Sequence, residues 1–126
     1  MCSSDLYLLI NQERKQAGVE ELSMNDTLNR LAQIKAKDLA ANAYLAHTSP
    51  TFGSPFEMIR NEGMQYTAAA ENIGRGQATA ADIVSAWMAS TGHQENILNP
   101  HYTQTGIGYA TDKDGKPYWV QLFLRE

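Results

Sequence analysis

Residues 103–124, TQTGIGYATDKDGKPYWVQLFL, decide the class of fold. The runs at the two ends of this stretch, 103–111 and 117–124, have the composition of β-strands, and apolar side chains alternate along the second. The connection between them contains Asp114-Gly115, and glycine supplies the positive φ that a tight hairpin turn requires. We therefore expect the chain to end in an antiparallel β-hairpin.

Upstream of the hairpin, apolar residues recur at helical spacing. A first helix is expected over residues 5–17, capped by Ser3 or Ser4 and ended by Gly18 in a left-handed conformation. A second helix should begin after a cap at Asn25 or Asp26 and run to about Ala43. Its inner face is expected to be formed by Leu28, Leu31, Ala32 and Leu39, while Arg30, Lys37 and Asp38 should point away.

Three shorter helices are expected after a loop that carries His47. They cover residues 55–62, residues 80–90 (capped by Thr79 and stopped by Gly92) and one turn over 93–98. The segment 65–76 is interpreted as irregular or as a brief strand. Helices followed by a terminal hairpin predict an α+β fold with helices covering a sheet, and residues 1–126 are expected to form a single domain.

Composition and charge exclude several classes of protein. The 126 residues are 43% hydrophobic with a net charge of −4, and the basic residues are scattered, so we expect no nucleic-acid partner. No apolar run is long enough for a transmembrane segment, and no charged-then-apolar export leader precedes Leu6. Cys2 is the single cysteine, so no internal disulfide can form. It is either an ordinary terminal cysteine or the lipid-bearing first residue of a lipoprotein.

Three short phrases carry the residues suited to chemistry: AHTSP with His47, AENIG with Glu71, and STGHQENIL with His93. Neutral imidazoles and a carboxylate are common ligands of divalent metals and common agents of proton transfer. The three side chains are expected to hold a divalent cation, with zinc the best match for such ligands. Alternatively, Glu71 does not touch the metal and instead orients a histidine ring by bonding to one of its nitrogens. The alternative is that both histidines only cap loops by hydrogen bonding.

With Trp87, these phrases resemble those of the CAP (SCP) family of cysteine-rich secretory, antigen and pathogenesis-related proteins, closest to its bacterial, disulfide-free extracellular branch. The resemblance extends from LINQERKQAGVEEL to PYWVQLFLRE. It implies a three-layer α-β-α sandwich with a surface cleft, and an extracellular or cell-envelope location.

The resemblance also implies a cleft with two histidines and two glutamates. His47 matches the first histidine and Glu71 the first glutamate, and His93 is preferred to His101 as the second histidine because of its distance to the Thr105-Gly106 strand. The family's Trp-x-x-Glu ends here in Ser90, so the second glutamate is missing. Glu57 or Glu95 could refill its position.

The function expected from these features is a binding module whose His/Glu cleft holds a divalent cation. Family members imply a peptide, lipid or cell-wall ligand, and nearby aromatic residues supply contacts: Tyr44, Phe52, Phe56, Tyr66 and Tyr102. The alternative is a metal-assisted, peptidase-like hydrolase that uses His47, Glu71 or His93 as its catalytic residues. An enzyme is the less favoured of the two, because Ser90 leaves the catalytic set incomplete.

Overall fold

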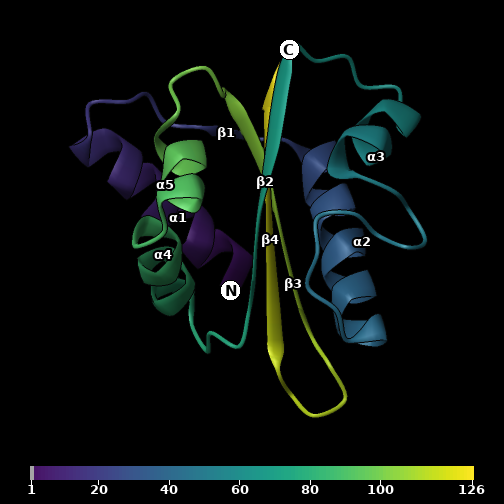
Figure 1. Cartoon of the computed structure of the whole chain (residues 1–126). Helices are drawn as coiled ribbons and strands as arrows, with labels where there is room; N and C mark the ends of the chain where they lie inside the picture. The colour runs from purple at the N-terminus through teal and green to yellow at the C-terminus, as the bar shows by residue number, and fades with distance from the viewer. Residues whose placement is uncertain (1) are drawn as a thin grey trace.

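The chain folds into one four-stranded sheet with helices on both faces (Figure 1). The computed structural model describes residues 2–126 and side chains from Ser4 onward, so both interpretations of the Cys2 side chain lie outside the described part. The elements in chain order are α1 (Cys2–Gln16), β1 (Ser23–Met24), α2 (Asp26–Asn42), α3 (Pro55–Asn61), β2 (Ala68–Arg75), α4 (Ala80–Met88), α5 (Thr91–Leu98), β3 (Gln104–Thr111) and β4 (Pro117–Arg125).

The strands are ordered β1-β3-β4-β2, which places the last strand of the chain inside the sheet and β2 at an edge. Both neighbours of β4 are antiparallel to it, whereas β1 pairs with β3 in parallel. The β3–β4 hairpin is confirmed: Gly115 has a φ of 82°, and the Asp112 carboxylate accepts from the backbone N–H groups of Asp114 and Lys116. This hairpin forms the centre of the molecule.

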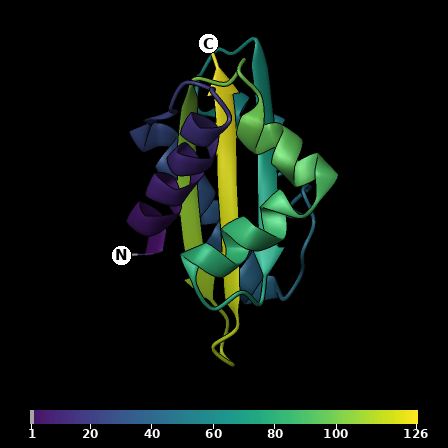
Figure 2. The same ribbon diagram turned by 90° about the vertical axis from the view of Figure 1, so that its left-hand side faces the viewer.

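The helices cover the sheet as two layers. Figure 1 shows the sheet edge-on between α1, α4 and α5 on one side and α2 and α3 on the other, and Figure 2 views the first of these layers. This confirms the α+β fold predicted from the sequence and the three-layer α-β-α sandwich that the family resemblance implies. Trp87 and Trp119 are buried in the cluster under α1, α4 and α5. Phe52 and Phe56 remain exposed at 41% and 40%.

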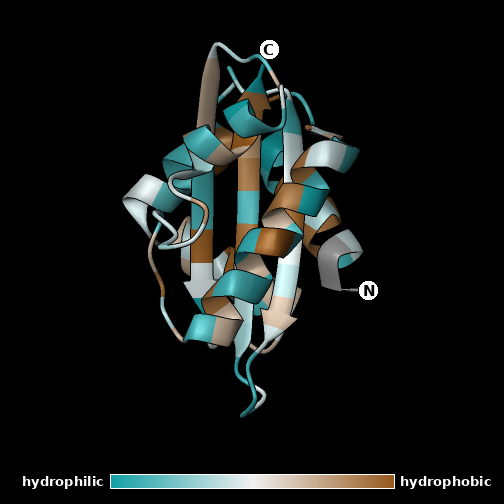
Figure 3. Ribbon diagram, turned by 90° about the vertical axis from the view of Figure 1, so that its right-hand side faces the viewer, coloured by the Kyte–Doolittle hydropathy of each residue, from teal (hydrophilic) through white to brown (hydrophobic). Residues whose placement is uncertain are grey.

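Helix α2 lies unusually close to β3. Hydrophobic and hydrophilic residues alternate along α2, which faces the viewer in Figure 3. A Cβ on Gly108 would lie 2.2 Å from the Ala32 carbonyl oxygen, and one on Gly106 would lie 2.1 Å from the Leu28 carbonyl carbon. Asn29 and Gln33 accept hydrogen bonds from the β3 backbone, and so satisfy a strand edge that the two-residue β1 leaves uncovered.

Several expected boundaries are wrong. The segment expected to be irregular or a brief strand contains the eight-residue strand β2, and β1 was not anticipated. Helix α1 begins at Cys2, so Ser3 and Ser4 lie within it rather than ahead of it. Helix α4 ends at Met88, and Gly92 lies inside α5 instead of stopping α4.

The caps of the other helices agree better with the expected ones. The side chains of Asn25 and Thr79 cap α2 and α4 by accepting from Leu28 N and Asp82 N. Across residues 2–126, every helix falls short of the length or the hydrophobicity that crossing a bilayer would demand.

Candidate functional site

Two consecutive residues of the edge strand β2 organise the candidate site. Successive side chains of a strand point to opposite faces, so Glu71 faces the α2 layer while Asn72 faces the α5 layer. Glu71 contacts His47, and Asn72 contacts the backbone of His93. The two histidines are far apart in the sequence, and β2 contacts one of them from each of its faces.

His47 lies in the loop between α2 and α3, and its side chain is 59% exposed. Its Nδ1 is 2.8 Å from Glu71 Oε1, in a side chain that is only 1% exposed. The Lys35 ammonium lies 3.4 and 3.3 Å from the two carboxylate oxygens of Glu71 and also donates to the His47 carbonyl oxygen. An ionised carboxylate only accepts, so Nδ1 is the donor of this bond, and in the neutral ring Nε2 is the nitrogen that keeps its lone pair.

The rest of the His47 loop is held by Asp38, one helical turn after Lys35. The Ser49 hydroxyl donates to Asp38 Oδ2 over 2.7 Å, and the Tyr44 hydroxyl donates to the same oxygen. Ser49 Oγ in turn accepts from the backbone N–H groups of Thr51 and Phe52. Burial, followed by the bond to Asp38, raises the pKa of Tyr44 to about 12. The expectation that Asp38 points away from the protein is therefore wrong, since this network buries it.

His93 lies in the first turns of α5 and is partly buried. Its Nδ1 is 2.9 Å from the hydroxyl oxygen of Ser90, the residue at the position where the resemblance implies a second glutamate. The imidazole lies nearly parallel to the Trp87 indole, with ring centroids 6.3 Å apart and 22° between the planes. Burial, and then the charge of nearby His47, lowers the pKa of His93. The neutral imidazole, which is the form that binds metals, is thereby favoured.

Asn72 and Asn96 fasten α5 to β2. The Asn72 amide donates to the His93 carbonyl oxygen over 3.1 Å, and the Asn96 amide donates to Asn72 Oδ1 over 2.9 Å. Asn72 is completely buried, so these bonds satisfy a polar group that would otherwise destabilise the fold. The two asparagines therefore join strand β2 to helix α5.

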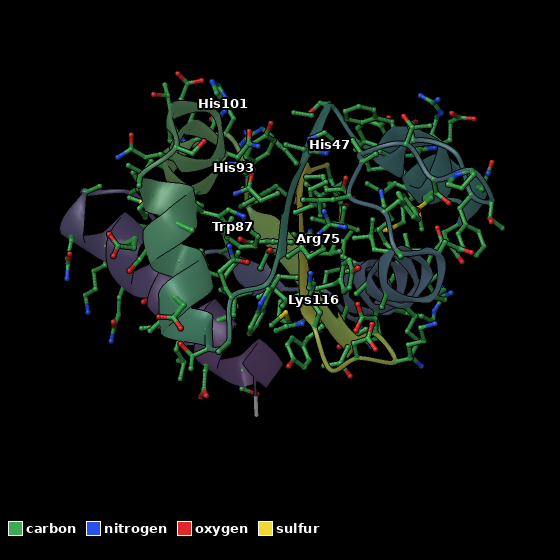
Figure 4. All side chains as sticks on the ribbon, turned by 60° about the horizontal axis from the view of Figure 1, so that its bottom comes forward. His47, Arg75, Trp87, His93, His101 and Lys116 are labelled. Carbon is green, nitrogen blue, oxygen red and sulfur yellow. The ribbon has the colours of Figure 1, made fainter. Side chains whose placement is uncertain are left out.

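Figure 4 shows His47 and His93 on the two flanks of β2, with His101 beyond α5. His101 is exposed, and its described hydrogen bonds involve its backbone. Neither glutamate considered for the missing position stands behind His93. Glu57 forms a capping box with Ser54 at the start of α3, and Glu95 is exposed on α5.

Of the three side chains expected to hold a metal, Glu71 has other partners, so only the ring nitrogens of the two histidines could serve as ligands. Glu71 is occupied by Lys35 and by the His47 ring, which fits the orienting role that the sequence left open for it. Within residues 2–126, no group of three or more histidine, cysteine, aspartate or glutamate side chains is placed to hold an ion. In both histidines Nδ1 contacts another side chain, so Nε2 is the ring nitrogen that could bind a metal. Three hollows, beside the β3–β4 turn, between α2 and α3, and between α1 and α4, are lined by other residues.

Comparisons with known proteins agree with this architecture. The model of the CAP, or cysteine-rich secretory protein, family matches residues 7–123. Protein YkwD of Bacillus subtilis is 42% identical over 116 residues, which are 92% of this chain but 44% of YkwD. The chain thus spans less than half the length of that relative.

Solved structures match over nearly the whole chain. An extracellular SCP-domain protein from Bacillus anthracis has a TM-score of 0.89 at 26% identity, over 98% of this chain and 40% of that one. An outer surface protein from Borrelia burgdorferi has a TM-score of 0.89 at 27% identity, over 98% of this chain and 91% of that one. NaASP2 with Zn2+ has a TM-score of 0.59 at 12% identity, over 83% and 60%, and so shares the fold alone.

Proposed function

The chain belongs to the CAP family, and from this membership we propose that it is an extracellular or cell-envelope binding module in which His47 and His93 hold a divalent cation. The described relatives include an extracellular protein and an outer surface protein, which supports the location. The proposed ion is zinc, which accepts imidazole ligands in open sites and accompanies the NaASP2 structure of this fold.

The observation that carries the proposal is that both histidine rings have the same kind of contact at Nδ1. Each imidazole has its Nδ1 engaged by a side chain behind it, Glu71 at 2.8 Å for His47 and Ser90 at 2.9 Å for His93. Such partners fix the ring orientation and direct the other nitrogen toward a metal. When bound, zinc would supply an electrophilic centre with positions open to water or to a ligand.

We favour a binding module over a metal-assisted hydrolase because none of the described side chains of the site is available for proton transfer. A hydrolase needs a general base near the attacking water. Glu71 is buried against Lys35 and His47, and Ser49 is buried against Asp38, so neither side chain is available as a base or as a nucleophile. His47 and His93, the other catalytic candidates, are the two ligands of the proposed ion, and a ring nitrogen that binds a metal cannot also accept a proton. The binding module is therefore the function that this arrangement favours.

Calorimetric titration of metal-free protein with zinc tests the proposal. We expect saturable binding to one site in the natural chain, lost in His47→Ala and in His93→Ala because each removes one of two ligands. His101→Ala serves as the matched control, since this histidine is exposed beyond α5 and should leave binding unchanged. A titration of the natural chain with no heat above background, or equal binding by all three variants, would overturn the assignment.

A further inference from the structure

Lys35 is a buried cation whose place in the fold calls for an explanation. Its side chain is 0% exposed, and it lies on the inner face of α2, between Leu31 and Leu39. Removing an ammonium and a carboxylate from water is costly, and apolar residues of similar volume often stabilise a fold as well or better. The Lys35–Glu71 pair is therefore poorly explained by stability alone.

The contacts of Lys35 converge on one residue, His47. Its ammonium donates directly to the His47 carbonyl oxygen, and it contacts both oxygens of Glu71, whose Oε1 holds the His47 ring. The backbone and the imidazole of His47 are thus tied to the same buried nitrogen. Without Lys35, the Glu71 carboxylate would keep only the exposed His47 ring as a side-chain partner, and the His47 carbonyl would lose its bond to α2.

We propose that Lys35 is a positioning residue for His47: it fixes the loop carbonyl and the Glu71 carboxylate together, so that the ring presents Nε2 in one orientation. The proposal rests on the proposed function only where it concerns zinc affinity. The orientation of the ring is a property of the metal-free protein and can be measured separately.

The first experiment compares Lys35→Met with Lys37→Met. The control removes the same charge from an exposed position of the same helix. The nitrogen chemical shifts of the His47 ring are recorded by NMR in metal-free protein, at a pH well above the ordinary histidine pKa. We expect the natural chain and Lys37→Met to show one tautomer with the proton on Nδ1, and Lys35→Met to show averaged shifts.

A second pair of variants avoids the chance that Lys35→Met fails to fold, since it leaves Glu71 buried without its ammonium partner. Glu71→Gln is compared with Lys35→Met/Glu71→Gln, in which no buried charge remains at either position. Zinc affinity is measured by calorimetry for both. We expect the double variant to bind about 10-fold more weakly, the effect typical of losing a group that orients a ligand.

The outcomes separate the two proposals. Unchanged ring shifts in a folded Lys35→Met protein, or equal zinc affinity in the second pair, would assign Lys35 to the fold alone and overturn the positioning role. If the natural chain binds no zinc, the proposed function fails, and the ring shifts still decide the role of Lys35. Averaged shifts in Lys35→Met with unchanged shifts in Lys37→Met support it.

Discussion

At the scale of single residues, the α2 side chains Lys35 and Asp38 hold the loop that carries His47. Both are charged and both are buried, Lys35 against Glu71 and Asp38 against Ser49 and Tyr44. A functional loop attached by buried polar bonds depends on the protonation states of those groups. Tyr44 provides the residue at which that dependence can be measured.

The first prediction concerns Tyr44 at alkaline pH. Burial and the bond to Asp38 raise its pKa from 10.0 to about 12, so the folded state keeps a proton that the unfolded state releases between these values. The stability that Tyr44 contributes is therefore complete below its unfolded pKa and is lost as the pH rises through its folded pKa. Phenolate absorbance should show a late-titrating tyrosine that Tyr44→Phe removes.

Two comparisons make this titration specific. Burial also raises the pKa of Tyr102, so Tyr44→Phe should remove one late step and leave another. In concentrated urea, where both are exposed, every tyrosine should titrate near the ordinary value. If the folded natural chain and Tyr44→Phe differ by one phenol that titrates at that ordinary value, the buried bond to Asp38 is absent in solution.

The candidate histidines could be located from the sequence, but the α2 side chains that hold the His47 loop could not. Short phrases and their order pointed to His47, Glu71 and His93, because these residue types stand out against their surroundings. Lys35 and Asp38 were missed because a charged residue in an amphipathic helix normally faces water. A signal was nevertheless present: Lys35 follows Leu31 by four positions and precedes Leu39 by four, which places it within the apolar stripe.

At the scale of elements, the close approach of α2 to β3 sets the position of Lys35. Gly106 and Gly108 let the helix backbone rest on the strand, and Asn29 and Gln33 bond to the strand edge. The helix was predictable because its leucines repeat at helical spacing. The full length of strand β2 was not predictable, because Ala68–Arg75 has one β-branched residue and is polar on both faces at Glu71 and Asn72.

A second prediction tests this approach through Gly108→Ala. The new Cβ would lie 2.2 Å from the Ala32 carbonyl oxygen, so α2 must move away from β3. We expect a loss of about 3 kcal/mol in the free energy of unfolding, the upper range for overpacking, measured by urea denaturation. Gly92→Ala is the control: its Cβ would meet nothing within 4 Å in α5, so a gain of about 0.5–1 kcal/mol is expected. Equal stability of the two variants would contradict the tight helix–strand contact.

At the scale of the whole molecule, β4 joins the two hydrophobic clusters into one structure. Alternate residues of this strand face opposite layers, with Val120 and Leu122 toward α2 and Trp119 and Phe123 toward α1, α4 and α5. The candidate site lies next to β4, on the edge strand β2 that pairs with it. Glu71 and Asn72 of β2 face the two opposite helical layers. Loosening either helical layer should therefore disturb one of the two histidines.

The layer that holds His93 depends on Arg14 of α1. Its guanidinium is buried, and it donates to the carbonyl oxygens of Ile97, Asn99 and Tyr102 at 2.8, 3.0 and 3.1 Å, which joins α1 to the end of α5 and to the approach to β3. Burial lowers the pKa of Arg14, and nearby Glu20 partly opposes this shift. The cation is held mainly by carbonyl dipoles, so removing it leaves several buried acceptors unpaired.

The third prediction follows for Arg14→Met. Unpaired carbonyl groups at the end of α5 should cost about 3 kcal/mol and lower the melting temperature by about 10 °C. Hydrogen exchange should accelerate first in α1 and α5, while amides of α2 and β3 keep their protection longer. Arg125→Met is the matched control, because Arg125 also donates to a carbonyl, that of His101, but at an exposed position where the bond contributes little. Uniform acceleration through both layers would mean that Arg14 stabilises the whole sandwich rather than the attachment of the His93 helix.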